Sequence, residues 1–158
     1  VPLRVTCLKA SDNYPKRYHT LMEDNQVINN SLKIVGQRRS FMEHLLTDSN
    51  EFFPFCYAIN NNNELTIISY QNPKNDKPKS HDVITGLKEK SDIQLKNGQI
   101  ISYGIAYDTY IKNDDNNSKT NCLVIEIKHK TISSSHSYSF PYQRDINGKI
   151  IFGEGFVN

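Results

Sequence analysis

The sequence predicts an α+β domain in which two helices lie on one face of a single antiparallel sheet of five to six strands. A length of 158 residues suits one domain with one sizeable core. Residues 100–111 give the longest strand pattern, with large side chains at odd positions and small ones at Ser102, Gly104 and Ala106. Successive side chains of a strand point to opposite faces, so one face is nearly bare. A bare face admits a helix at close range.

The first 30 residues carry no sustained period. Val5, Leu8 and Leu21 are scattered among prolines and polar residues. We expect residues 1–30 to form an N-terminal arm or lead-in, and residues 31–158 to form the single α+β domain.

Two segments have helical periodicity. In residues 31–47 the apolar positions recur at intervals of three and four, with Ser31 as the expected N-cap. Residues 81–96 follow Ser80, a second expected N-cap, and end at Asn97-Gly98. The expected buried side chains of the two helices are Ile34, Val35, Phe41, Met42, Leu45, Leu46, Val83, Ile84, Leu87 and Leu95.

The remaining apolar segments read as strands joined by hairpins. Residues 52–59 and 64–70 flank an asparagine run and predict one hairpin, with Pro54 kept out of full pairing. Residues 122–130, 137–142 and 150–152 follow the long strand, and residues 145–149 have hairpin turn chemistry. Consecutive hairpins imply an antiparallel sheet, and helices separated in this way can share one face of it.

Charge and composition exclude several classes of partner. The 19 basic and 17 acidic residues are interspersed and give a net charge of +2, without the basic face that nucleic acids require. No apolar run approaches membrane-spanning length, so no membrane association is expected. The three cysteines, Cys7, Cys56 and Cys122, are widely spaced and form neither a disulfide framework nor a zinc motif. A reducing, cytoplasmic setting is expected.

No catalytic or cofactor motif stands out. Asp108 is the one acid in the 103–110 strand segment and falls on its small-residue face, where a carboxylate beside aromatic rings could act as a general base. The five histidines lack metal-ligand spacing, and His129 with His136 is the best pair available. Cys56 or Cys122 beside a histidine is an alternative nucleophile. We therefore expect no cofactor and no metal.

Aromatic residues are more informative. The chain has nine Tyr, seven Phe and no Trp. Tyr103, Tyr107, Tyr138 and Tyr142 are expected to leave an exposed aromatic surface on the strand face that the helices do not cover. Exposed surfaces of this kind favour a partner chain or a homodimer. These four residues and Asp108 are the predicted binding residues.

Two resemblances accompany these patterns. The order of helices and strands resembles the profilin-like and roadblock-like layout in topology. The segment 52–55 entering a hairpin, Ala106-Tyr107-Asp108, Pro141-Tyr142 and the segment 152–154 together resemble a small bacterial α+β family without assigned activity, over residues 31–158. That resemblance carries over no catalytic residues. Small bacterial domains of this size include immunity proteins, which bind and block a toxin.

Two hypotheses of function result. The first is a non-enzymatic protein-interaction domain, either an immunity-type partner or a self-associating chain. The alternative is a small enzyme or ligand-binding domain, with a pocket between helix and sheet around Asp108.

Overall fold

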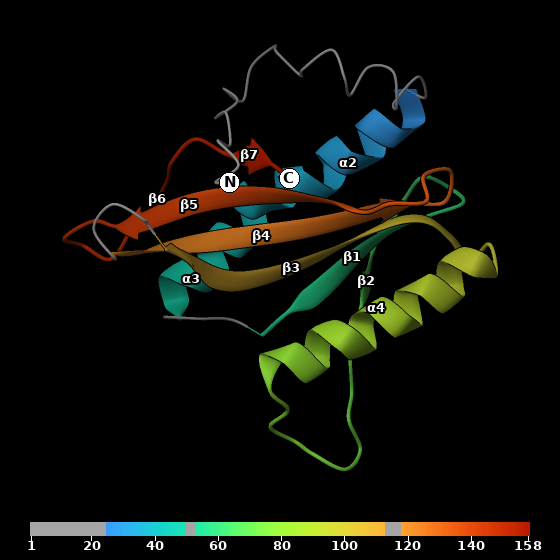
Figure 1. Ribbon diagram of the computed structural model, residues 1–158, viewed down its shortest axis with the longest axis horizontal. Coiled ribbons are helices and arrows are strands. Elements are labelled where there is room, and N and C mark those ends of the chain that lie inside the picture. Colours follow the sequence, from blue (N-terminus) through green and yellow to red (C-terminus); the bar gives the residue numbers. More distant parts are fainter. Residues whose placement is uncertain (1–24, 50–52, 113–117) are drawn as a thin grey trace.

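A computed structural model of the chain describes residues 25–49, 53–112 and 118–158, and Figure 1 shows their arrangement. An N-terminal helical segment precedes a hairpin, a second helix and five further strands. In chain order the elements are α2 (Asn25–Gln37), the π-helical stretch η1 (Arg38–Met42), α3 (Glu43–Asp48), β1 (Phe55–Asn60), β2 (Leu65–Ile68), α4 (Ser80–Lys96), β3 (Ile100–Lys112), β4 (Lys119–His129), β5 (His136–Arg144), β6 (Ile150–Phe152) and β7 (Phe156–Val157).

The strands form one antiparallel sheet, as predicted, but a larger one than expected. Its order is β2-β1-β3-β4-β5-β6, and β7 also pairs with β5, which makes seven strands among the described residues. Every strand pairing among the described residues is antiparallel. The predicted hairpin β1–β2 and the turn before β6 are confirmed. The extra strand, β7, follows Gly153–Gly155 and is too short to show periodicity in the sequence.

The prediction that both helices lie on one face of the sheet is wrong. The segment α2–η1–α3 packs on the face that carries Tyr57, Ile125 and Phe140. Helix α4 packs on the other face, against Cys56 and Ile105. Figure 1 shows α3 passing behind the strands, away from α4. The central strand explains the difference, because residues 100–106 of β3 are buried throughout and both of their faces need cover.

The small-residue face of β3 admits a helix closely, as predicted. A Cβ added to Gly104 would lie 2.4 Å from Cγ2 of Ile34 in α2. The bulky face of the same strand, with Tyr103 and Ile105, receives α4 instead. The sheet is therefore sandwiched between the two helical segments, with its core on both sides.

The first helix starts earlier than predicted. Helix α2 begins at Asn25, inside the segment expected to be an arm, and residues 1–24 lie outside the described residues. Ser31 is not an N-cap but a buried residue within the helix, next to the buried Asn30. The apolar period extends back to Val27, which is also buried, and the asparagines around it conceal this in the sequence.

Candidate functional site

Asp108 lies on the face of the sheet that α2 covers. It is opposite Leu123 in β4, a residue of the core on that side. The hydroxyl of Tyr142 in β5 donates to Oδ1 of Asp108 at 2.8 Å. Burial raises the pKa of Tyr142, and the hydrogen bond to Asp108 raises it further. The pair connects β3 to β5 across β4, and the carboxylate already has a protein donor.

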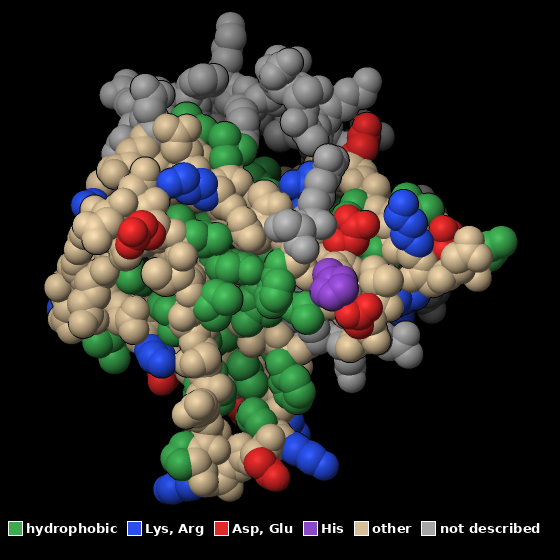
Figure 2. Space-filling model, turned by 180° about the vertical axis from the view of Figure 1, so that it is seen from behind, with side chains coloured by type: hydrophobic (Ala, Val, Ile, Leu, Met, Phe, Trp, Pro, Cys, Tyr) green, Lys and Arg blue, Asp and Glu red, His purple; other side chains and the backbone are tan. Residues whose placement is uncertain are grey.

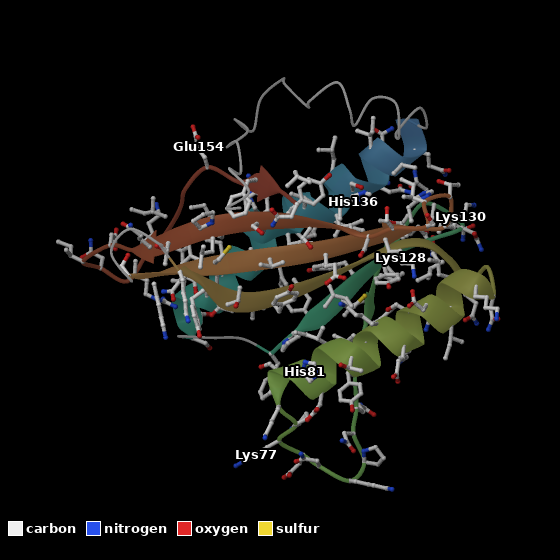
Figure 3. All side chains as sticks on the ribbon, in the orientation of Figure 1. Lys77, His81, Lys128, Lys130, His136 and Glu154 are labelled. Carbon is white, nitrogen blue, oxygen red and sulfur yellow. The ribbon has the colours of Figure 1, made fainter. Side chains whose placement is uncertain are left out.

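A second polar group lies between the sheet and α4. Tyr103 donates to Oδ1 of Asp92 in α4 at 2.8 Å, and Nζ of Lys128 lies 2.8 Å from the same oxygen. Figure 3 labels Lys128 between the strands and α4. Burial acts to raise the pKa of Asp92, but the bonds from Lys128 and Tyr103 outweigh it and lower that pKa. Lys88 and Glu126 form a parallel ion pair at 3.0 Å. These contacts tie α4 to side chains of β3 and β4.

The prediction of one exposed aromatic surface is wrong. Tyr138 and Tyr142 are 8% and 2% exposed and belong to the core beneath α2. Tyr103 is 4% exposed and packs with the half-buried Tyr107 on the α4 side. Tyr103 and Tyr107 share one face of β3, and Tyr138 and Tyr142 share one face of β5, as the alternation predicts. The register with which both strands pair with β4 places these two faces on opposite sides of the sheet. The binding roles of these residues and Asp108 stay predictions.

The geometry gives little support to a cysteine nucleophile or to a metal site at His129 and His136. Burial raises the pKa of the Cys56 and Cys122 thiols to about 11, which leaves little thiolate at neutral pH. His136 lies opposite Ile127, not opposite His129, whose Nδ1 is 2.9 Å from Thr131. Within the described ranges, no group of three or more His, Cys, Asp and Glu side chains could hold a metal ion.

An apolar surface that the sequence did not single out lies at the β2 edge of the sheet. Ile67 of β2 is 59% exposed and faces the same side as Tyr57, its partner in β1. Phe41 packs edge-to-face on Phe55 and Tyr57, with ring centroids 5.4 and 6.1 Å apart. Figure 2, seen from behind, shows apolar side chains gathered near the centre of this side. We call this surface the edge patch and define it as Phe41, Phe55, Leu65 and Ile67.

The backbone of β2 is open along the same edge. Among the described residues β2 pairs only with β1. The amide of Asn60 donates to the carbonyl of Glu64, so even-numbered β1 residues direct their backbone groups toward β2. Their partners Thr66 and Ile68 face β1 in return. By alternation, Leu65 and Ile67 direct their amide and carbonyl groups outward. The side chains of the same two residues belong to the edge patch.

Each end of β2 carries a lysine bonded to a backbone carbonyl. Lys33 of α2 donates to the carbonyl of Asn63 at 2.9 Å, and Lys90 of α4 donates to that of Ser69 at 2.9 Å. Neither ammonium group has a carboxylate within ion-pair distance in the described part of the chain. The edge therefore combines apolar side chains and outward backbone groups, with a lysine at each end and Glu64 next to Asn63.

The edge patch could have been found from one feature of the sequence. Leu65 and Ile67 alternate with Glu64 and Thr66 in the second strand of a predicted hairpin, which precedes a proline-containing loop. A strand that leads into a long loop is a candidate for the edge of a sheet.

Comparison with protein-family models, with curated proteins and with solved structures found no match. The described residues include no helix that is long and apolar enough to cross a membrane.

Proposed function

We propose that this chain is a protein-interaction domain that docks an extended protein segment against β2. The observation that carries the proposal is the coincidence, on Leu65 and Ile67, of outward backbone groups and apolar side chains. An added strand would hydrogen-bond to this edge and lay alternate side chains on the edge patch, the mode known as strand addition. Apolar edges are normally protected by proline, inward charges, covering segments or very short strands. Residues 65–68 form a strand of four residues and contain no proline and no charged residue.

A ligand-binding pocket around Asp108, the alternative, receives less support. Tyr142 already donates to its carboxylate, and Ile34 packs tightly on Gly104, which lies on the same face of β3 four residues earlier.

The test is a selection of peptides from a random displayed library on the full chain. We expect enriched peptides with alternating apolar residues, and we expect Ile67→Glu to weaken their binding by about tenfold or more, because a charge then replaces a central contact. Ile151→Glu is the matched control, since Ile151 is 55% exposed on β6, the last strand at the other end of the sheet order. Failure to enrich any peptide, or equal binding to both variants, would overturn the proposal.

A further inference from the structure

The charges around β2 identify an occupant for its edge. Lys90 marks the Ser69 end of the strand with a positive charge. Glu64 marks the opposite end with a negative one, and its Oε2 accepts from Nδ2 of Asn60 at 2.9 Å. Asn60 pairs with Ile100, a residue of the core beneath α4, so Glu64 lies on the α4 side of the sheet. Lys90 extends from α4 itself. The two charges therefore share one face and lie at opposite ends of the strand.

On the α4 face, opposite charges at the two ends make the strand complementary to an antiparallel copy of itself. We infer that the segment docked against β2 is β2 of a second copy of this chain, related by a two-fold axis at Thr66. This inference rests on the proposed function, because it names the partner that strand addition recruits. In an isologous dimer the same patch serves both subunits.

The backbone pattern selects this register. With the axis at Thr66, Leu65 of one copy lies opposite Ile67 of the other, and both residues direct their amide and carbonyl groups outward. The pairing uses only residues within β2. It also places Leu65 of one copy against the exposed Ile67 of the other, so the two edge patches form one continuous apolar stripe.

The same register brings the charges together. Glu64 then lies opposite Ile68 of the other copy, one residue from the Ser69 carbonyl that holds Lys90. With a strand spacing of about 4.8 Å and a rise of about 3.4 Å per residue, this carboxylate comes within reach of the ammonium group once it turns from Asn60 toward the other copy. The symmetry forms two such pairs. In this register Asn63 lies opposite Ser69 of the other copy, so Lys33 comes to the same end of the interface as Lys90, but from α2 on the other face of the sheet. A contact of this size predicts a reversible monomer–dimer equilibrium, since small interfaces bind weakly.

The experiment is sedimentation equilibrium of the full chain over a range of concentrations, with two charge-reversal variants. Glu64→Lys alone and Lys90→Glu alone each place like charges at both contacts, and we expect each to weaken the dimer about tenfold. An equimolar mixture of the two variants restores opposite charges at both contacts, so we expect heterodimers of near wild-type affinity. Glu89→Lys is the control, because Glu89 is an exposed neighbour of Lys90 on α4.

Three outcomes would overturn the inference. The first is a wild-type chain that stays monomeric while the peptides selected above still bind, which would leave the proposed function intact with another protein as the occupant. The second is a dimer that Ile67→Glu does not weaken, which would place the interface elsewhere. The third is a variant mixture that stays as weak as its components, which would exclude the register.

Discussion

At the scale of single residues, Gly104 decides how closely the first helical segment approaches the sheet. Its missing side chain leaves room for Ile34, and side-chain atoms of Ile125 and Ile127 in β4 lie 3.4 Å from the position that a Cβ would take. From the small side chains of β3 it was predictable that a helix would approach this face closely. The partner of Gly104 could not be predicted, because the two residues lie 70 positions apart and meet only when the fold is complete.

We expect Gly104→Ala to destabilise the chain by about 1–3 kcal/mol, because the added methyl group overpacks a closed interface. Gly36→Ala is the matched control. A Cβ on Gly36 would meet nothing within 4 Å, and Gly36 lies inside α2, so this change should stabilise by about 0.5–1 kcal/mol. Urea unfolding measures both. Equal effects of the same sign would show that α2 does not pack on Gly104.

At the scale of elements, α4 depends on contacts that its own sequence does not reveal. Its apolar stripe is thin, and Asp92, Lys88 and Lys90 look like ordinary solvent-exposed charges. In the structure Asp92 accepts hydrogen bonds from Tyr103 and Lys128, which belong to two different strands. The existence of the helix was predictable from its period and from Asn97-Gly98 at its end, but the predicted N-cap Ser80 is wrong, because the helix includes Ser80 and its N-cap is Lys79. The face on which it packs was not predictable, because that depends on the pairing of β3 with β4.

The lowered pKa of Asp92 makes the docking of α4 dependent on pH. A carboxyl group whose pKa is lower in the folded state stabilises that state above the pKa of the unfolded chain, about 3.9. This contribution is lost as pH falls through the lower, folded value. We expect Asp92→Asn to be less stable than wild type at neutral pH, with the difference shrinking as pH falls below about 4.

Urea midpoints at a series of pH values test this expectation. Asp76→Asn is the control, because Asp76 is exposed in the loop before α4. A constant gap between wild type and Asp92→Asn across the acid range would mean that the carboxylate charge does not hold α4.

At the scale of the whole molecule, the proposed function depends on which strand is left at the edge. The hairpin β1–β2 was predictable from residues 52–70, but its place in the sheet was not. β1 pairs with β3 through partners such as Tyr57 and Gly104, which are far apart in sequence. Without knowledge of the β1–β3 pairing, the sequence predicts Ile67 to be a core residue of the hairpin. The other end of the sheet is closed differently, by strands of three and two residues that offer little edge to pair with.

Amide hydrogen exchange of the β2 residues tests whether a second copy pairs with this edge, one residue at a time. In the monomer the amides of Leu65 and Ile67 point outward, whereas those of Thr66 and Ile68 bond to β1. In the proposed dimer the outward amides gain carbonyl acceptors from the other copy. We expect exchange at Leu65 and Ile67 to slow as protein concentration rises, while Thr66 and Ile68, the internal controls, change little. Slowing at all four residues together would indicate global stabilisation, and no change at Leu65 and Ile67 would leave the edge unpaired.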